Sequence, residues 1–208
     1  MRVVVDSESS RDLRQSELRR HLQMMARFVE RTKVEGPFSL TMILRSAGSD
    51  PAKVLVGMTG ALQRAGVRAK VILAKLEPED ELKQLFASLS ELAPHEPAPG
   101  LIRWARNPRL LEAHEQVIYG EAMCWSGDAM RRDADRRNAL TLFDEEAPDT
   151  VRLGRLAFAA LWTASSLVPE RRLMGPATAR PSGAYEQMSE APVTALRANL
   201  QGWPLIRH

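Results

Sequence analysis

Apolar residues in the first half of the chain recur with helical spacing in some stretches and form short runs in others. Residues 11–33 carry apolar side chains at positions i, i+4, i+7 and i+11, which predicts an amphipathic helix. These side chains are Leu18, Leu22, Met25 and Val29. The runs 38–44 and 67–76 are apolar and bounded by turn residues, which predicts two strands.

A helix is expected between these two strands. Asp50 is its expected N-cap, Pro51 occupies the first helical position, and Gly66 ends it. A strand, a helix and a second strand in this order favour parallel pairing of the strands with a right-handed crossover. A further helix is expected over residues 78–92, where apolar side chains again follow a helical stripe.

The pattern changes after the proline-rich stretch 93–100. Three short strands and a last helix are expected there. They cover residues 101–106, 115–123, 139–143 and 149–165. This order of elements favours one layered α/β domain over two domains. We expect the domain to span residues 1–168, with helix 11–33 packed on it and residues 169–208 as an irregular C-terminal tail or wrapping segment.

The composition is that of an ordinary folded protein, since 44% of the 208 residues are hydrophobic and 26% are charged. No apolar stretch is long enough to span a membrane, and the first residues lack the apolar core of a signal peptide. The one cysteine, Cys124, is expected in the core and excludes an internal disulfide and a cysteine-rich zinc site. We therefore expect a cytoplasmic protein.

Charge and histidine placement exclude further kinds of site. The formal net charge is +3 and no segment is a basic block, so no footprint for duplex nucleic acid is visible. No two histidines make a metal-binding constellation, and we expect His21 and His95 to be exposed. The sequence predicts neither a metal nor a cofactor.

One segment combines residue types that suit phosphoryl chemistry. His114 and Gln116 stand two apart in an expected strand, so their side chains should share a face. Glu121 follows five residues later, and Ser126 begins a Ser-Gly-Asp sequence that is expected to form a turn. This segment resembles the signature of the phospholipase D superfamily: a histidine, a lysine two residues on, an aspartate five beyond, and a Gly-Ser-x-Asn turn.

The order of elements around the motif adds to the resemblance. Residues 65–73 are similar to the family's strand that begins Gly-Val-x-Val, and residues 138–143 to its late strand. Phe158 and Trp162 match the aromatic residues of its closing helix. The resemblance covers about residues 15–165. It implies an α/β fold in which a phospholipase D-like layered sheet is flanked by helices.

The resemblance also implies roles for the motif residues. His114 would attack phosphorus, and Glu121 would orient it. Gln116 stands where the family has the lysine that clamps the growing phosphoryl charge, and Ser126 belongs to the glycine-serine turn. Because Gln116 is uncharged, the rate of phosphodiester hydrolysis is expected to fall by roughly a hundredfold or more.

An arginine-rich stretch directly after the motif is the expected ligand-binding region. If the implied fold holds, its side chains lie near the mouth of the site, where arginine suits phosphate recognition. These residues are Arg131, Arg132, Arg136, Arg137 and Asn138. Without the resemblance, the same stretch reads as a solvated turn of mixed charge.

Three functions stay open on the sequence. The first is a non-catalytic or impaired phospholipase D-like protein that binds a phosphate-bearing ligand or nucleic acid in the cleft of a homodimer. The second is an atypical phosphodiesterase in which His114 side chains of two subunits meet and an arginine of 131–137 replaces the lysine. The third is a scaffold that contacts other proteins through helix 11–33 and the tail. The absent lysine favours the first.

Overall fold

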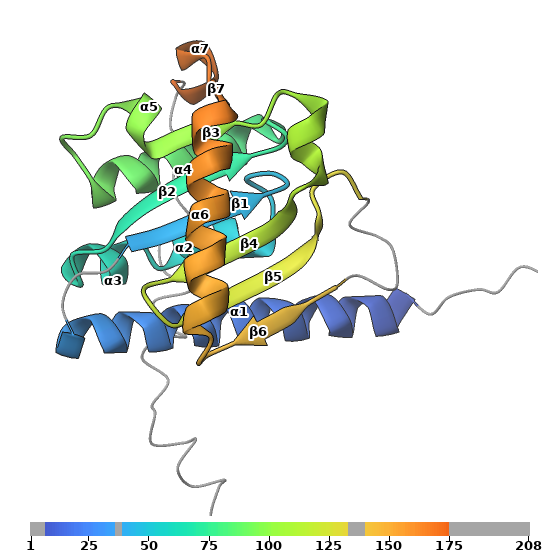
Figure 1. Ribbon diagram of the computed structural model, residues 1–208, viewed down its shortest axis with the longest axis vertical. Coiled ribbons are helices and arrows are strands. Elements are labelled where there is room, and N and C mark those ends of the chain that lie inside the picture. The colour runs from blue at the N-terminus through green and yellow to red at the C-terminus, as the bar shows by residue number, and fades with distance from the viewer. Residues whose placement is uncertain (1–6, 36–38, 133–139, 175–208) are drawn as a thin grey trace, which may run out of the picture. The chain divides into compact units, whose positions relative to one another are not determined.

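A computed structural model describes residues 7–35, 39–132 and 140–174, all of which belong to one compact unit. Its centre is a seven-stranded mixed sheet in the order β6-β5-β4-β1-β2-β3-β7, flanked by helices (Figure 1). The elements, in chain order, are α1 (Ser7–Glu35), β1 (Ser39–Leu44), α2 (Asp50–Gly57), α3 (Thr59–Arg64), β2 (Arg68–Leu73), α4 (Glu79–Leu92), α5 (Ala98–Leu101), β3 (Ile102–Trp104), the 3-10 helix η1 (Pro108–Glu112), β4 (His114–Tyr119), β5 (Met123–Ala129), β6 (Leu142–Asp144), α6 (Pro148–Ala164), β7 (Ser166–Leu167) and α7 (Glu170–Leu173). The predicted α/β class and the long N-terminal helix are confirmed.

The parallel part of the sheet consists of β1, β2 and β3. Helices α2 and α3 connect β1 to β2, and α4 and α5 connect β2 to β3. The expected parallel β–α–β unit is therefore present. β4 runs antiparallel to β1 on its other side and starts a purely antiparallel half of the sheet with β5 and β6.

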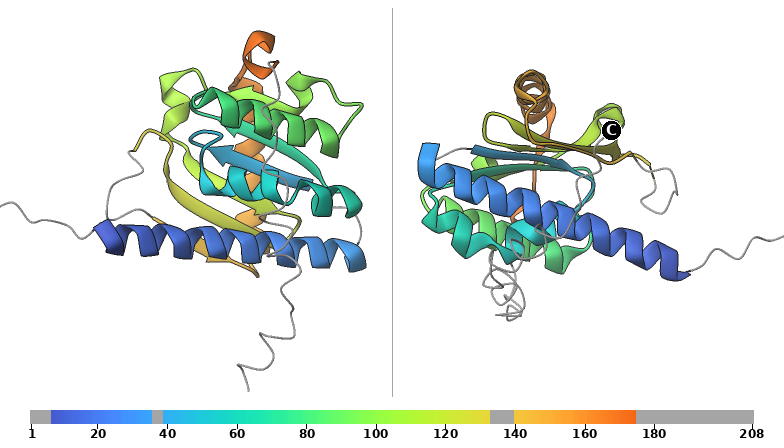
Figure 2. Two further views of the ribbon diagram at one scale, coloured as in Figure 1. Left: turned by 180° about the vertical axis from the view of Figure 1, so that it is seen from behind. Right: turned by 90° about the horizontal axis from the view of Figure 1, so that it is seen from below.

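Helices cover the two faces of the sheet unequally (Figure 2). One face packs against α1, α2 and α4, and its buried apolar cluster includes Phe28 of α1 and Met42 of β1. The other face is crossed by α6, whose Phe158 packs on Ile43 and Ile72. Large apolar side chains alternate between these two clusters along β1 and β2, as strand geometry requires.

The expected strand 115–123 is wrong, because the chain reverses within it. β4 ends at Tyr119, and Gly120 adopts a φ of 63°, a left-handed conformation that glycine enters without steric cost. β5 then runs from Met123 to Ala129 beside β4. Ser126 consequently lies inside a strand, and the predicted turn at that residue is also wrong. The apolar residues from Met123 begin the strand, and its pairing with β4 continues it through Ser126 to Ala129.

The start of α2 differs from the prediction by one residue. Ser49 is the N-cap, with extended backbone at φ −66° and ψ 146°, and Asp50 is already helical. Pro51 stands in the first turn as expected. The Ser49 hydroxyl makes no capping hydrogen bond with the helix and lies within 3.4 Å of Glu115 Oε1.

The final helix, α6, is confirmed, and its Val151, Gly154 and Phe158 face the sheet. Leu153 and Leu156 on its outer side are exposed. Among the residues described, no helix combines the length and apolar character needed to cross a membrane. β7 and α7 follow α6, and the part of the predicted tail from residue 175 onward lies outside the described residues.

Candidate functional site

Of the four residues of the predicted phosphoryl-transfer motif, Glu121 lies apart from the other three. His114 begins β4, and its Nδ1 lies 2.8 Å from the carbonyl oxygen of Gly127. Glu121 lies past the other end of that strand, roughly 17 Å away or more. There, its two carboxylate oxygens accept hydrogen bonds of 2.6 Å from the two terminal nitrogens of Arg155. Glu121 therefore fastens the β4–β5 hairpin to α6 and makes no contact that orients His114.

Gln116 and Ser126 are neighbours across β4 and β5. The register shifts between His114 and Gln116, where Glu115 of β4 lies opposite two residues of β5, Gly127 and Asp128. The irregularity is therefore on β5, and the prediction that His114 and Gln116 share a face of β4 stays open. Gln116 is half-buried beneath α6, where a Cβ built on Gly154 would come within 2.7 Å of its Nε2. Helix α6 can thus approach β4 closely at Gly154 because glycine has no side chain.

Two of the predicted ligand-binding arginines already have acidic partners. Arg131 Nε lies 3.0 Å from Glu112, and Arg132 Nη1 donates a 3.0 Å hydrogen bond to Asp128. Both arginines are more than half exposed. The other predicted binding residues lie outside the described residues; they are Arg136, Arg137 and Asn138.

A pocket of about 500 Å³ opens where β1 ends. Its walls come from α1, the β1–α2 loop, the start of α4, and the neighbouring ends of β4 and β5. In α/β sheets such crevices form at the carboxyl end of a strand whose neighbours connect in different directions. β1 meets that description, because its connection leads to β2 on one side, and the connection from β3 returns to β4 on the other side. The volume is typical of a site for a small molecule.

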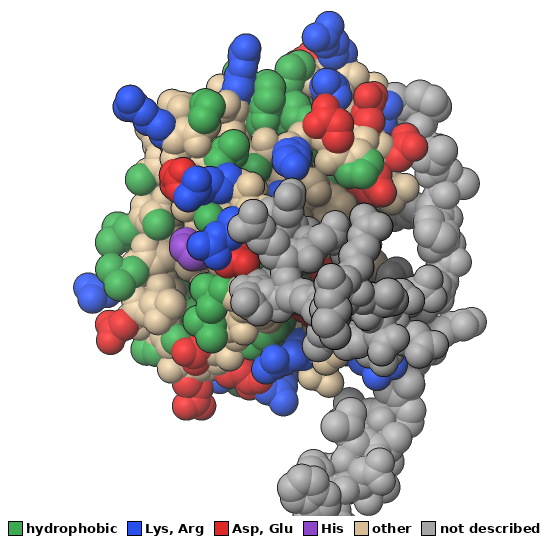
Figure 3. Space-filling view, turned by 90° about the vertical axis from the view of Figure 1, so that its right-hand side faces the viewer, with side chains coloured by type: hydrophobic (Ala, Val, Ile, Leu, Met, Phe, Trp, Pro, Cys, Tyr) green, Lys and Arg blue, Asp and Glu red, His purple; other side chains and the backbone are tan. Residues whose placement is uncertain are grey.

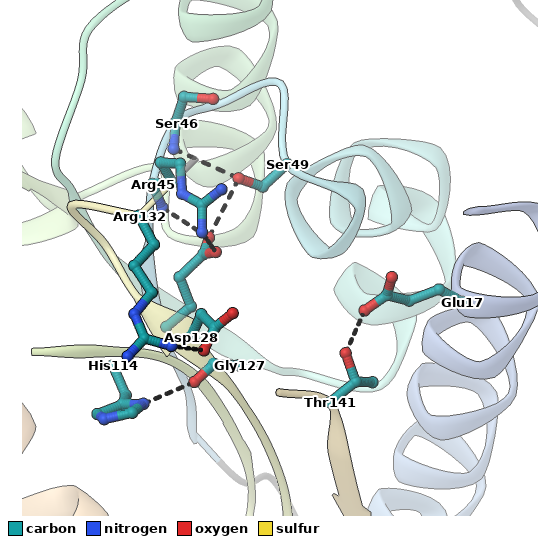
Figure 4. A network of polar contacts seen from close by, with 10 residues as sticks. Glu17, Arg45, Ser46, Ser49, His114, Gly127, Asp128, Arg132 and Thr141 are labelled. Carbon is teal, nitrogen blue, oxygen red and sulfur yellow. Dashed lines mark hydrogen bonds and ion pairs between the residues drawn. The ribbon is translucent and has the colours of Figure 1, made fainter. Parts of the chain in front are cut away.

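Arg45 and Ser49 lie close together just after β1 (Figure 4), and Glu115 of β4 contacts both of them. Its Oε1 accepts a 2.8 Å hydrogen bond from the backbone N–H of Arg45 and a longer one from Ser49, and its Oε2 lies 2.8 Å from Arg45 Nη2. The Arg45 and Glu115 side chains are 12% and 10% exposed. Burial raises the pKa of the Glu115 carboxyl, and the hydrogen bond and charge of Arg45 oppose that rise. This buried cluster fixes one rim of the pocket.

Carboxylates outnumber cations in the pocket lining. Five acidic side chains line it, against Arg45 and Lys53. The acidic residues are Glu17, Asp50, Glu81, Glu115 and Asp128. Arg132 adds a third cation through its contact with Asp128. Negative charge is therefore still in excess when Arg132 is counted.

The carboxylates differ in how strongly they are already engaged. Glu17 Oε1 accepts a 2.8 Å hydrogen bond from the Thr141 hydroxyl (Figure 4). Glu81, in the first turn of α4, has no hydrogen-bond or ion-pair partner within the described part of the chain. Basic and acidic side chains are interspersed on the coloured part of the surface in Figure 3. Glu81 is the carboxylate most available to a ligand.

His21 is buried, which contradicts the expectation that it is exposed. It is 1% exposed, and its ring packs edge-on against Trp125 and Phe143 at centroid distances of 4.7 Å and 4.9 Å. Burial, with a smaller contribution from Arg20, lowers the pKa of His21 to about 4. The ring is therefore neutral at pH 7. The helical stripe of α1 contains no sign of this contact, because the aromatic partners of His21 come much later in the sequence.

Two ring nitrogens in the pocket walls lack partners. His21 Nδ1 and Trp125 Nε1 are both buried, and neither has a hydrogen-bond partner among the described residues. Both residues line the pocket. Surrounding side chains enclose both atoms, so the two rings face the pocket with other parts of their surface than these nitrogens.

Glu115 and Asp128 are the functional candidates that the sequence did not single out. Both flank motif residues, and both are acids inside strands at buried positions. The two residues could have been found by searching for acids inside predicted strands, since a buried carboxylate needs a cationic partner. Arg45, at the end of the first predicted strand, is that partner for Glu115.

Among the described residues, no group of three or more histidine, cysteine, aspartate and glutamate side chains is placed to hold a metal ion. No protein-family model, curated protein or solved structure matches this chain. The resemblance to the phospholipase D superfamily, and the homodimer with paired His114 side chains that it implies, stay predictions.

Proposed function

We propose that this protein is a non-catalytic binding protein for a small organic molecule with a positively charged amino or guanidinium group. The observation that carries the proposal is the excess of carboxylates over cations in a pocket of about 500 Å³. Opposite charges attract more strongly at a partly buried site than in bulk water, so a cationic ligand gains affinity and selectivity there.

Two further features support a cationic ligand with a polar or aromatic body. Glu81 offers a carboxylate that has no partner among the described residues. Trp125 and His21 add aromatic side chains to the pocket lining. An anion at the same position would face Glu81, Glu17 and Asp128 at short range. The phosphate-bearing ligand implied by the sequence resemblance is therefore the alternative that the pocket favours less.

The positions and partners of the motif residues support a protein without catalysis. His114 has its Nδ1 against the carbonyl of Gly127, and Glu121 is engaged by Arg155. Gln116, half-buried under α6, brings no charge to a developing phosphoryl oxyanion. We expect no turnover of bis-p-nitrophenyl phosphate that depends on His114. Hydrolysis by the native protein that His114→Ala abolishes would establish the phosphodiesterase instead.

Isothermal titration calorimetry tests the ligand class. The organic cations agmatine and spermidine are titrated into the protein at pH 7, and inorganic phosphate and AMP serve as a small and a larger anion. We expect saturable binding of at least one cation at one site per chain, and no saturable binding of either anion. Saturable binding of phosphate or AMP, with none of the cations, would overturn the proposal.

A further inference from the structure

A second charged surface lies on the face of the sheet that α6 crosses. Strand alternation places Arg68 and Lys70 of β2 on the same face as Ile72, which packs in the cluster with Phe158 of α6. Both basic side chains are exposed. Arg103 of β3 is the register partner of Ile72 and adds a third cation to this face.

Trp162 of α6 lies among these cations. Lys70 Nζ is 5.4 Å and Arg103 Cζ is 5.3 Å from the centroid of its ring. Phe158 stacks with the same ring at a centroid distance of 5.5 Å and holds it in place. Arg68, Lys70, Arg103 and Trp162 are called the Trp162 patch below.

The positive charges of the Trp162 patch are not neutralised by acids in the described part of the chain. Arg68 and Lys70 make no ion pair there, and Arg103 donates from Nε to the carbonyl oxygen of Pro99 at 3.0 Å. The patch thus leaves three positive charges available to an anionic partner.

The neighbouring hairpin does not neutralise the patch either. Gly120 donates its N–H to the carbonyl oxygen of Ser39, and Ser39 is the register partner of Arg68, so the hairpin is close to this edge of the patch. The acid of that hairpin is Glu121, and both of its oxygens already accept from Arg155.

We infer that the Trp162 patch binds the phosphodiester backbone of a single-stranded nucleic acid. Phosphate oxygens give Lys70 and Arg103 a stronger partner than an aromatic ring, so both can turn from Trp162 to the backbone. The ring face that they leave is then available to a base, and base–aromatic stacking is tolerant of sequence. Three cations suit a short stretch of one flexible strand better than a duplex, since no broad basic footprint surrounds them.

Fluorescence anisotropy with a fluorescein-labelled oligothymidylate tests this inference over a series of salt concentrations. The variant replaces the three cations, as Arg68→Gln, Lys70→Gln and Arg103→Gln together. We expect it to weaken binding by about tenfold and to lower the slope of log K against log salt by about 2, since each lost phosphate contact on a single strand contributes roughly 0.7. The pair Arg68→Gln and Lys70→Gln keeps the hydrogen bond of Arg103 and should show about two thirds of that change in slope.

The matched control removes three exposed or half-exposed cations from the helices on the opposite face, as Arg19→Gln, Arg31→Gln and Arg64→Gln. An equal loss of affinity in the control would show that net charge alone matters, and it would overturn the inference. The same holds if the native protein fails to bind the oligonucleotide. Binding to vesicles that contain phosphatidylserine, without binding to the oligonucleotide, would assign the patch to a membrane surface and overturn it as well.

Discussion

Strand β4 carries a glutamate at each end, and the two are used in different ways. Glu115, near the start, forms a buried ion pair with Arg45, with side chains 10% and 12% exposed. Glu121, past the end, pairs with Arg155 at side-chain exposures of 62% and 34%. The sequence motif singled out Glu121 on its spacing from His114. The pocket, however, is built around Glu115, because burial and not spacing decides which carboxylate shapes a site.

The largest expected effect comes from Glu115, the buried glutamate near the start of β4. Glu115→Gln leaves the Arg45 guanidinium buried without its counter-charge, and we expect the free energy of unfolding to fall by about 3–5 kcal/mol. Urea denaturation followed by circular dichroism measures this change. A loss below about 1 kcal/mol would mean that the Arg45–Glu115 pair behaves like a surface pair, and the contrast between the two ends would be lost.

His21, which lines the pocket, should make the free energy of unfolding depend on pH. Its pKa is about 4 in the folded protein and 6.5 in the unfolded chain, so only the unfolded state takes up the proton between these values. The free energy of unfolding contributed by His21 is complete above pH 6.5 and falls by roughly 3 kcal/mol as the pH drops to 4. The raised pKa of Glu115 works in the opposite direction, so a matched variant is needed to isolate His21.

His21→Phe provides that comparison, because a phenylalanine ring can keep the edge-on contacts with Trp125 and Phe143 without titrating. We expect the stability of His21→Phe, relative to the native protein, to rise as the pH falls from 7 to 4. The exposed His95→Gln serves as the control and should follow the native curve. Parallel curves for His21→Phe and the native protein would show that the buried imidazole does not titrate as described.

Ligand binding by a variant of the pocket lining provides a third test, with a smaller expected effect. Glu81→Gln removes a carboxylate that has no partner among the described residues, so the fold should be little affected. We expect the affinity for agmatine or spermidine to fall by about tenfold, the loss of one charge-assisted hydrogen bond. Glu30→Gln, on the exposed side of α1, makes the same change in net charge and should leave the affinity unchanged. Equal losses in both variants would remove Glu81 from the site.

The smallest effect is expected for Glu121, the exposed glutamate that follows β4. Glu121→Gln breaks an ion pair that is largely solvated, and we expect a loss of about 0.2–1 kcal/mol in the free energy of unfolding. Measured under the same conditions, it is the matched control for Glu115→Gln on the same strand. A larger loss from Glu121→Gln than from Glu115→Gln would reverse the account of β4.

Local pattern was sufficient to predict much of the fold. The helix around Met25 and Val29, the strands β1 and β2 and the helix α4 follow from apolar spacing within single elements. The reversal at Gly120 was missed because only Gly120 and Glu121 separate two apolar, strand-forming runs, and the motif assigned Glu121 a role in the site instead of in a turn. The phospholipase D-like arrangement stays a prediction.

The candidate site was harder to predict because its contacts join distant parts of the sequence. Glu115 accepts from the backbone of Arg45 across 70 residues. His21 is buried against Trp125 and Phe143, and a helical stripe that is read alone does not contain those partners. Such contacts depend on how the strands and helices pack together, and the spacing of residues along one element does not determine that packing.

The most direct test of the cationic pocket is the indole N–H resonance of Trp125 in a ¹H–¹⁵N NMR spectrum, assigned with Trp125→Phe. The account predicts that agmatine or spermidine shifts this resonance progressively to saturation, while the indole signals of Trp104 and Trp162 stay in place. An unmoved Trp125 signal at concentrations that saturate binding, or a shift caused by AMP and not by the amines, would contradict it.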